Sequence, residues 1–319
     1  MNINNLKKNS LYNKHIISMH DFKKNQIELI LKFANILKNK PHLKLLKNKI
    51  IANCFFESST RTRLSFETAA YKLGASNIGF SDGNNIALKN KGESLSDTIS
   101  VISKYADVII IRHPQEGSAK LASQFSNGIP IINAGDGFNQ HPTQTILDLF
   151  TIKETQKKIK NLKIAIVGDL KYGRTVHSLT QALAKFSNNT LFFISQPHLS
   201  IPKYICNMLN KKKIKWKKVL NIKDIISKID ILYMTRIQRE RVNPNKNINF
   251  KPYFILTAKI LKHAKKNLKI LHPLPRINEI AYDVDKTPYA YYFKQAENGI
   301  YARQAILSLI LKKNILQKI

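Results

Sequence analysis

The segment from Glu57 to Arg63 concentrates groups that bind an anion. It reads Glu-Ser-Ser-Thr-Arg-Thr-Arg, follows the apolar run 50–56 and opens a helical stretch. The first N–H groups of a helix have no carbonyl partner within the helix, and the helix dipole adds a positive field there. The hydroxyls and guanidinium groups gathered here predict a phosphate site, with an ordinary helix cap beside two surface arginines as the alternative. The candidate ligands are Ser59, Thr60, Arg61 and Thr62.

Two further segments follow strands at the edge where sites of α/β proteins lie. His141 and Gln144 stand three residues apart at a helix start, after the Gly-Asp-Gly turn 135–137. A lone histidine is more often structural, so its place after a strand is what makes His141 a candidate. The run 272–276, His-Pro-Leu-Pro-Arg, also follows a strand. Its prolines leave the carbonyl groups of Pro273 and Leu274 able to accept hydrogen bonds from a substrate amine, unless the run is only a rigid turn.

Arginine is rare in this chain, so its positions carry information. Lysine supplies 44 of the 53 positive side chains and arginine nine. Arg236 and Gln238 follow a strand and enter the polar loop 236–251, where a surface charge run is the alternative. A planar guanidinium binds a carboxylate or a phosphate through two hydrogen bonds, which an ammonium cannot do. We therefore expect the arginines to bind anionic groups, and seven of the nine lie in the runs 57–63, 168–175, 236–241 and 272–276.

Residues 168–175 have the spacing of a nucleotide-binding loop, Gly-x-x-x-x-Gly-Arg-Thr. Such a loop needs a lysine to reach the terminal phosphates, and this lysine-rich chain has Arg174 there. The apolar run 230–234 also does not end in an aspartate that would bind magnesium. The sequence therefore argues against an NTPase.

Short β-branched apolar runs alternate with helical stretches along the chain. This alternation predicts an α/β protein with two doubly wound parallel-sheet domains, 1–142 and 143–298, and a C-terminal helix, 299–319, that packs back on the first. The polar loops 81–93 and 236–251 are candidate lids. The predicted strands are 50–56, 108–111, 129–132, 162–168, 191–194, 230–234 and 268–273, and the predicted helices include 22–38, 61–73, 94–105, 142–154, 174–186, 252–266 and 301–312.

The composition of the 319 residues, 43% hydrophobic and 23% charged, is typical of a globular protein with buried cores. Cys54 and Cys206 are too few for a disulfide framework, and no Cys/His cluster at metal-ligand spacing surrounds them, so we expect a reduced compartment and no metal. No run approaches the roughly 18 apolar residues of a membrane span. These features predict a soluble, cytoplasmic protein.

The net charge of +33 suggests nucleic acid as a partner at first sight. Lysine, asparagine and isoleucine are abundant together along the whole chain, however, which indicates a global compositional drift. A nucleic-acid surface would more often cluster its charge and interleave aromatic residues. We therefore predict no nucleic-acid partner, and a salt-dependent gel shift tests the alternative.

Taken in order, these motifs resemble the aspartate/ornithine carbamoyltransferase family, and most closely its aspartate-specific catalytic chains of the enteric bacterial type. The resemblance implies transfer of a carbamoyl group from carbamoyl phosphate to the α-amino group of L-aspartate, the committed step toward pyrimidines. It implies no metal or organic cofactor. The segments that carry it are 58–75, 111–117, 134–156, 167–186, 230–241, 272–276 and 297–307, which together cover nearly the whole chain.

The resemblance implies a carbamoyl phosphate site that lies mainly in the first domain and also includes Pro273 and Leu274 of the second. Thr62, Arg112 and His141 would donate hydrogen bonds to the carbonyl oxygen and stabilise the oxyanion that grows as the amine attacks. Gln144 and the carbonyl of Pro273 would hold the carbamoyl NH2. The phosphate would be held by Ser59, Thr60, Arg61, Thr62 and Arg112, and the catalytic residues would be Arg61, Thr62, Arg112 and His141.

In the second domain, the resemblance implies an aspartate site. Arg174 and Arg236, helped by Gln238, would bind the two carboxylates. The carbonyl of Leu274 would accept a hydrogen bond from the attacking amine. Lys91 would reach the site from a neighbouring chain of a homotrimer with shared active sites. The segment 111–126 resembles the surface that contacts regulatory chains in a larger, dodecameric assembly of the enteric type.

The chain departs from the family in its first polar loop, where a serine normally accompanies the lysine. Here Ala87 replaces the serine and Lys91 is retained. A hydrogen bond to a charged group contributes about 1.5–3 kcal/mol. We expect lower efficiency than is usual in the family and predict that Ala87→Ser raises kcat/KM.

Ornithine carbamoyltransferase is the alternative within the family. That enzyme has a cysteine where the run 272–276 has proline, and its Ser-Met-Gly signature is missing from the second half of this chain. Arg236 with Gln238 suits a carboxylate better than an amine. The sequence therefore favours aspartate.

Overall fold

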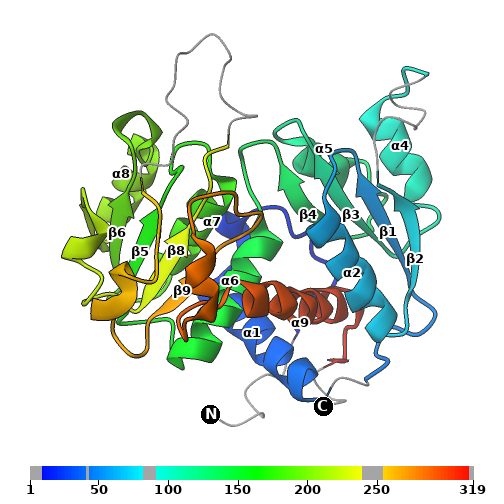
Figure 1. Cartoon of the computed structure of the whole chain (residues 1–319). Helices are drawn as coiled ribbons and strands as arrows, with labels where there is room; N and C mark the ends of the chain where they lie inside the picture. Colours follow the sequence, from blue (N-terminus) through cyan, green and yellow to red (C-terminus); the bar gives the residue numbers. More distant parts are fainter. Residues whose placement is uncertain (1–8, 41–42, 82–90, 239–253, 316–319) are drawn as a thin grey trace. The chain divides into compact units, whose positions relative to one another are not determined.

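The computed structural model describes residues 9–40, 43–81, 91–238 and 254–315, and the chain divides into two compact units (Figure 1). The first unit contains Met1–Leu147 and Asn298–Ile319, and the second contains Asp148–Glu297. Helices α6 (Pro142–Gln156) and α9 (Tyr292–Leu311) each begin in one unit and end in the other. Each unit has a parallel sheet and flanking helices, so the predicted α/β fold is confirmed.

The first unit is built on a four-stranded parallel sheet with the order β2-β1-β3-β4. The chain passes from β1 to one neighbour, β2, and later places β3 on the other side of β1. The topological switch point, where ligands bind in such sheets, therefore lies between β1 and β3. The strands are β1 (Ile50–Phe55), β2 (Ser76–Phe80), β3 (Val108–His113) and β4 (Ile131–Asp136), and the helices are α1 (Lys24–Asn39), α2 (Thr60–Lys72), α4 (Leu95–Ile102) and α5 (Ser118–Gln124), with the 3-10 helix η2 (Met19–Asp21).

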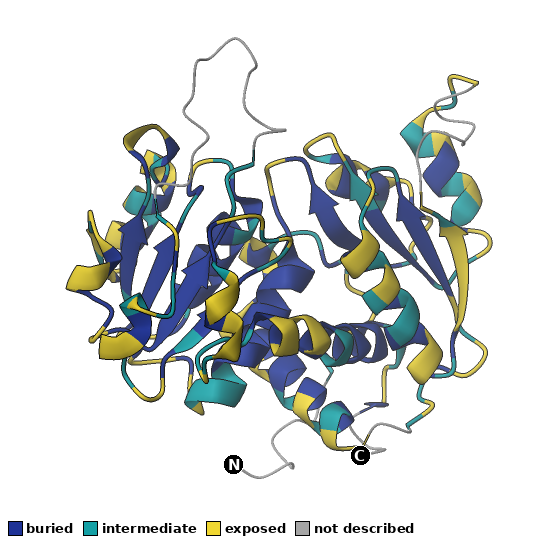
Figure 2. Ribbon diagram, in the orientation of Figure 1, coloured by how far each residue is buried: buried dark blue, intermediate teal, exposed yellow. Residues whose placement is uncertain are grey.

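Helices cover this sheet and bury strands β1, β3 and β4, which explains the continuous apolar runs in the sequence (Figure 2). Helix α2 packs against β1 and β2, and α5 packs against β3 and β4. On one face, Ile109 and Ile111 join Ile99 of α4 and Ala119 of α5 in a common core. Strand β2 lies at the edge and is mostly exposed, so its polar sequence gave no apolar signal.

The second unit contains a five-stranded parallel sheet with the order β7-β6-β5-β8-β9. Its switch point lies between β5 and β8. The edge strand β7 carries three lysines and was not predicted, for the same reason as β2. The strands are β5 (Lys163–Val167), β6 (Thr190–Ile194), β7 (Lys215–Lys218), β8 (Ile231–Met234) and β9 (Lys269–Leu271), and the helices are α7 (Arg174–Leu183) and α8 (Lys203–Lys211), with 3-10 helices η4 (Pro197–Leu199), η5 (Ile222–Asp224), η7 (Ile260–His263) and η8 (Tyr282–Lys286).

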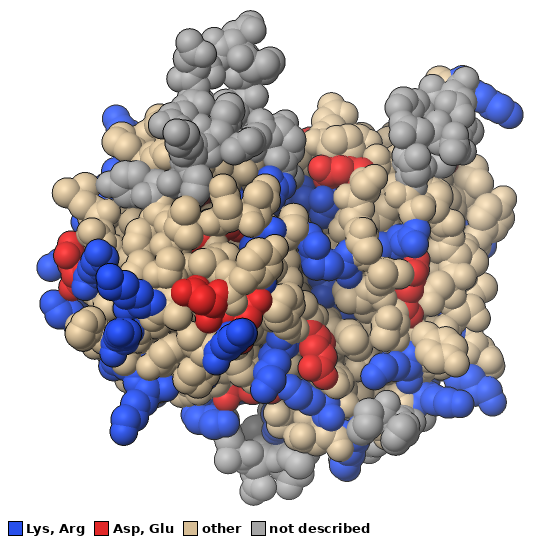
Figure 3. Space-filling view, in the orientation of Figure 1, with Lys and Arg blue, Asp and Glu red and all other residues tan. Residues whose placement is uncertain are grey.

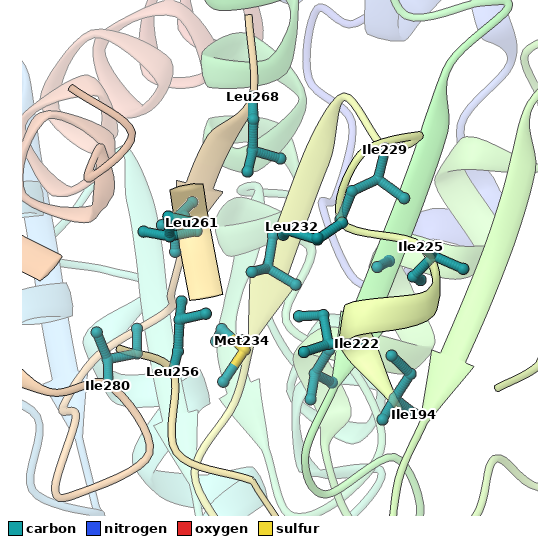
Figure 4. Close-up of a cluster of buried hydrophobic side chains, with 14 of the residues drawn as sticks. Ile194, Ile222, Ile225, Ile229, Leu232, Met234, Leu256, Leu261, Leu268 and Ile280 are labelled. Atoms are coloured by element: carbon teal, nitrogen blue, oxygen red, sulfur yellow. The ribbon is translucent and has the colours of Figure 1, made fainter. Parts of the chain in front are cut away.

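The helix predicted for 252–266 is wrong. The described part, from Phe254 onward, contains only the short 3-10 helix η7 and an isolated parallel bridge between Leu256 and Ile280. Leu256 donates its N–H to the carbonyl of Glu279 at 2.9 Å, and it enters a core with Leu261 and Ile280 (Figure 4). This tertiary pairing overrides the local helical periodicity.

Helix α9 begins at Tyr292, nine residues before the start predicted from its apolar pattern. From Asn298 onward it belongs to the first unit, where Ala302–Ile310 are buried. Asn9 Nδ2 donates to the carbonyl of Leu309 at 2.7 Å, and Lys38 Nζ donates to Asn298 Oδ1 at 2.9 Å. The expected return of the C-terminal helix to the first unit is confirmed.

Lysine and arginine side chains are scattered over the face that Figure 3 shows, on elements of both units. This distribution agrees with a composition that is lysine-rich throughout. Among the described residues, no helix has the length and apolar character needed to cross a membrane.

Candidate active site

The N-terminus of α2 follows the carboxyl end of β1 in the first unit. Ser59 is the N-cap residue, and its side chain makes no capping hydrogen bond to the helix. Thr60 and Arg61 are exposed, whereas Thr62 is buried. The hydroxyl of Ser59 and the first N–H groups of the helix together form the kind of terminus that binds a phosphate. The four candidate ligands therefore lie at one helix start.

Arg112 lies beside this helix start, on the neighbouring strand β3. It pairs with Phe55 in the sheet register, and its carbonyl accepts the Phe56 N–H at 2.8 Å. Its guanidinium Nη2 is 3.2 Å from Glu57 Oε2, and only 12% of the side chain is exposed. Arg63 instead pairs with Glu67 along the helix at 3.4 Å. Glu57 thus holds the Arg112 guanidinium at the switch point, next to the phosphate candidates.

The turn after β4 carries His141 and is built around a carboxylate. Asp136, 1% exposed, accepts hydrogen bonds from Asn133 Nδ2 at 2.8 Å and from Gln140 N at 3.1 Å. Gly137 has φ +49°, and a Cβ there would lie 2.5 Å from Glu116 Cγ. The turn therefore requires glycine. Sequence reasoning noted the Gly-Asp-Gly turn but missed the role of Asp136 in fixing the approach to His141.

His141 immediately precedes α6, and Gln144 lies in the first turn of that helix. Both side chains are buried, with 5% and 8% exposed. The carboxyl ends of β1, β3 and β4 are adjacent in the sheet, so the structure brings these two residues to the same sheet edge as Arg112. Seven of the predicted site residues thus share one edge: Ser59, Thr60, Arg61, Thr62, Arg112, His141 and Gln144.

In the second unit, Asp169 joins two segments that carry candidate residues. Its buried carboxylate accepts the N–H of Tyr172 at 2.9 Å and the N–H of Gln238 at 3.2 Å. The side chain of Gln238 also donates to the carbonyl of Tyr172 at 3.2 Å. Arg174, buried at 5% exposure, begins α7 just after this loop, and Arg236 is half-buried just after β8. Asp169 therefore holds the surroundings of both arginines together. It lies inside the run 168–175, but its residue type and spacing there did not predict this role.

The close approach of β5 and β8 depends on Gly168. Its φ is +118°, and a Cβ there would lie 2.1 Å from the carbonyl oxygen of Thr235. The Thr235 hydroxyl accepts the Asp169 N–H at 3.1 Å. A pocket opens at this edge, lined among others by Gly168, Arg236 and Glu279. The switch point of the second sheet thus contains a pocket. One residue that lines it is Arg236, which is predicted to bind a carboxylate of the substrate.

The run 272–276 follows β9 and turns sharply. Leu274 has φ +56°. Pro273 and Leu274 are half-buried, and neither carbonyl accepts a hydrogen bond from the described residues. Arg276 is held by two ion-pair contacts to Asp285, both at 2.5 Å. The two carbonyls, rather than Arg276, are the groups that this turn offers to a ligand.

Lys91 is exposed and lies just before α4 in the first unit. Ala87 and most of the two candidate lid loops, 81–93 and 236–251, lie outside the described residues. Within the described ranges, no group of histidine, cysteine, aspartate and glutamate side chains is arranged to hold a metal ion. Burial raises the pKa of the Cys54 thiol to about 12, so this cysteine is not a nucleophile.

Two family models match the chain in succession. Residues 14–154 match the carbamoyl-P binding domain of aspartate/ornithine carbamoyltransferase, and residues 160–310 match the Asp/Orn binding domain. Each match covers most of one structural unit.

Known proteins similar to this chain bear related names. The aspartate carbamoyltransferase catalytic subunit of Buchnera aphidicola subsp. Schizaphis graminum is 68% identical over 95% of this chain and 98% of its own length. The catalytic subunit of M. jannaschii aspartate transcarbamoylase is 49% identical, with a TM-score of 0.85 over 96% of this chain and 98% of that one. A Trypanosoma cruzi aspartate transcarbamoylase, solved with N-(phosphonacetyl)-L-aspartic acid, is 33% identical, with a TM-score of 0.89 over 95% and 97%. The chain belongs to the aspartate/ornithine carbamoyltransferase family, as its motifs predicted.

Proposed function

We propose that this chain transfers the carbamoyl group of carbamoyl phosphate to the α-amino group of L-aspartate, a step of pyrimidine synthesis. The amine nitrogen attacks the carbonyl carbon, the bond from that carbon to the phosphate oxygen breaks, and the amine loses a proton. The products are N-carbamoyl-L-aspartate and phosphate. The 68% identical relative carries the name of this activity, and a T. cruzi relative was solved with carbamoyl phosphate and aspartate.

The observation that carries the proposal is the helix start at the switch point of the first sheet. Phosphate is the anion that such a terminus binds best, because several N–H groups and hydroxyls converge on it. Arg112, held by Glu57, adds a charged fork on the adjacent strand. We assign carbamoyl phosphate to residues 1–142 with 299–319. Its phosphate group is bound by Ser59, Thr60, Arg61, Thr62 and Arg112.

Catalysis in this proposal is mainly electrostatic. Thr62, Arg112 and His141 donate hydrogen bonds to the carbonyl oxygen, whose negative charge grows as the amine attacks. A well-placed donor of this kind is worth about 2.7–4 kcal/mol. The burial of Thr62 and His141 supports this role, since a donor screened from water stabilises charge more strongly. Arg61 is the fourth catalytic residue, and it acts by binding the phosphate, which is the leaving group.

Residues 143–298 bind aspartate in this proposal. Arg174 and Arg236 bind its two carboxylates, and Gln238 helps to orient them. The carbonyl of Leu274 accepts a hydrogen bond from the amine. The buried Asp169 supports the assignment, because it fixes the segments that carry these side chains. The carbamoyl NH2 is held by Gln144 and the carbonyl of Pro273.

The decisive assay supplies the purified chain with carbamoyl phosphate and either L-aspartate or L-ornithine, and measures phosphate release and the carbamoylated product. We expect N-carbamoyl-L-aspartate and no citrulline. Turnover with ornithine alone would make the enzyme an ornithine carbamoyltransferase and would leave the carbamoyl phosphate site intact.

The proposal includes a cytoplasmic homotrimer in which Lys91 serves the active site of a neighbouring chain. Lys91→Ala and Arg61→Ala chains are each expected to be inactive. Mixed trimers should regain activity, because some of their sites draw an intact Arg61 and an intact Lys91 from different chains. No recovery after verified subunit exchange would show that Lys91 acts within its own chain.

Regulatory chains are a further part of the proposal, supported by the catalytic-subunit name of the Buchnera relative. They would contact the segment 111–126, which includes α5. Sedimentation of the native complex from its source cells distinguishes a bare trimer from a dodecameric assembly.

A further inference from the structure

A ring of hydrogen bonds closes the turn that carries Pro273 and Leu274. His272 Nδ1 accepts the backbone N–H of Leu274 at 2.8 Å, and His272 Nε2 lies 2.7 Å from Glu279 Oε1. Glu279 also accepts the N–H groups of Ile277 and Asn278 at 3.2 Å. His272 and Glu279 are 2% and 5% exposed. The first and last residues of the turn are therefore joined by buried side chains.

These contacts fix the protonation state of the His272 imidazole. Because Nδ1 accepts a hydrogen bond, it carries no proton, and Nε2 must carry the proton that is donated to Glu279. Burial lowers the pKa of His272 by more than the hydrogen bond and negative charge of Glu279 raise it, and the charges of Arg236 and Arg276 lower it further. Burial alone would raise the pKa of Glu279, but the hydrogen bond from His272 holds it below its ordinary value. The pair is a neutral imidazole beside a carboxylate.

The bond to His272 Nδ1 sets the direction of the Pro273 carbonyl. The Leu274 N–H and the Pro273 C=O belong to the same planar peptide group and point in opposite directions. Fixing the N–H on the histidine therefore aims the carbonyl away from it. Leu274 has φ +56°, a left-handed conformation that a leucine seldom adopts without support. The hydrogen bonds of His272 and Glu279 supply that support. Leu274 is also the residue whose carbonyl is assigned to the amine of aspartate.

A second set of buried contacts anchors His272 itself within the same unit. Its backbone N–H donates to Gln295 Oε1 at 2.8 Å, and Gln295 Nε2 donates to Asp148 Oδ1 at 2.7 Å. The other oxygen of Asp148 accepts the Tyr233 hydroxyl at 2.9 Å. Gln295, Asp148 and Tyr233 are all 1% exposed or less. His272 is thus anchored by buried hydrogen bonds to residues of α6, β8 and α9.

We propose that His272 and Glu279 are positioning residues that aim the Pro273 carbonyl at the carbamoyl NH2 during the reaction. They touch no substrate and act through the peptide group between Pro273 and Leu274. The inference rests on the role proposed above for that carbonyl. It goes beyond that role because it identifies the side chains that hold the turn in the conformation in which the Pro273 carbonyl can accept this hydrogen bond.

Two substitutions of His272 test its two hydrogen bonds separately, the one from the Leu274 N–H and the one to Glu279. In His272→Asn, the side-chain oxygen takes the place of Nδ1 and keeps the acceptor for the Leu274 N–H. In His272→Gln, the amide takes the place of Nε2 and keeps the donor for Glu279, while the acceptor for Leu274 is lost. We expect His272→Asn to retain kcat within about fivefold of the wild-type value and His272→Gln to lose at least about tenfold more, because small misplacements of reacting groups are costly.

Inorganic phosphate provides the internal control, since it lacks the carbamoyl group that the Pro273 carbonyl binds. Its inhibition constant against carbamoyl phosphate should stay within about twofold of wild type in both variants. His263→Gln, which changes an exposed histidine of η7, should leave all constants unchanged. Equal losses of kcat in the two His272 variants at equal thermal stability, or a loss of phosphate binding, would overturn the proposal.

A second pair of variants covers the case in which the His272 variants do not fold. Glu279→Gln keeps an oxygen for the His272 Nε2–H, and Glu279→Leu removes it at similar size. We expect kcat to fall at least about tenfold more in Glu279→Leu. Equal kcat values would overturn the positioning role. Wild-type turnover with aspartate decides the proposed function separately, because that assay does not depend on these variants.

Discussion

The two units present their binding groups in different ways. In the first unit, the phosphate candidates Ser59 to Thr62 are consecutive and share one helix terminus. In the second unit, Arg174, Arg236 and Leu274 are spread over 100 residues of sequence and stand on three separate segments. Buried carboxylates hold the second set in place. Asp169 contacts the segments that carry Arg174 and Arg236, and Glu279 contacts His272 in the turn that contains Leu274.

This difference follows from the shapes of the proposed ligands. A phosphate group is compact and accepts hydrogen bonds all around, so one helix start can surround most of it. Aspartate is an open molecule whose two carboxylates and amine point in different directions. Groups that bind it must come from several directions, and each loop that carries them needs its own internal support. The second region is therefore expected to be more sensitive to changes away from the ligand.

The largest expected effect is at the helix terminus of the first unit. Arg61→Lys keeps the charge but replaces the bidentate fork with a single ammonium. We expect a loss in kcat/KM of about 100-fold or more, the size measured when one strong transition-state donor is removed. Steady-state kinetics with both substrates check this. Near-normal turnover would show that Arg61 does not bind the phosphate.

The next largest effect is expected at a carboxylate ligand of the second unit. Arg236→Ala should raise KM for aspartate by about 10–100-fold, which corresponds to a hydrogen bond with a charged group of about 1.5–3 kcal/mol. Binding of carbamoyl phosphate should stay nearly intact, because its phosphate is assigned to the first unit. If carbamoyl phosphate affinity collapsed while aspartate saturation did not change, the division of labour between the units would be wrong.

Sequence reasoning predicted the first region well because its information is local. The strand 50–56, the hydroxyl and arginine cluster and the helix start follow one another in the chain, and α2 begins at Thr60, next to the predicted 61. The central strands were predicted for the same reason, since a strand buried on both faces is apolar throughout. Edge strands β2 and β7 lack this signal.

The supports of the second region could not be read from the sequence. Asp169 is an ordinary loop residue until the fold brings the backbone of Gln238 to 3.2 Å from its carboxylate. Glu279 belongs to no motif, and only its distance of 2.7 Å from His272 reveals its role. The helix predicted over 252–266 failed for a related reason, since Leu256 pairs with a segment more than 20 residues away. Contacts of this kind depend on tertiary structure, which local periodicity does not report.

A smaller effect tests whether the second region depends on its internal supports. Asp169→Asn removes the charge of a carboxylate that accepts the Tyr172 and Gln238 N–H groups, but it keeps one oxygen. We expect KM for aspartate to rise by up to about tenfold, since one charged hydrogen bond is lost. The inhibition constant of inorganic phosphate should not change. Asp107→Asn, at the pair between Asp107 and Lys49 in the first unit, is the matched control and should leave KM for aspartate unchanged.

The smallest expected effect concerns the dependence of stability on pH. The pKa of His272 is lowered by burial, so the folded chain resists a proton that the unfolded chain accepts below about pH 6.5. The groups facing the ring are Glu279, Arg236 and Arg276, and Glu279 stays ionised in this range because its own pKa is lowered. Since the unfolded state then binds more protons, the free energy of unfolding must fall as the pH drops below 6.5.

His272→Asn removes this titration and should flatten the decline. One proton corresponds to at most about 1.4 kcal/mol per pH unit. The measurement is urea unfolding of the wild type and the variant at pH 7 and pH 5.5. His15, His113 and His177, whose pKa values burial also lowers, remain in both proteins and keep a residual slope. The same slope in both proteins would mean that the folded chain accepts a proton at His272 as readily as the unfolded chain. The hydrogen bond from Leu274 to Nδ1 would then not be formed in solution, and the second region would lack one of the supports that distinguish it from the first.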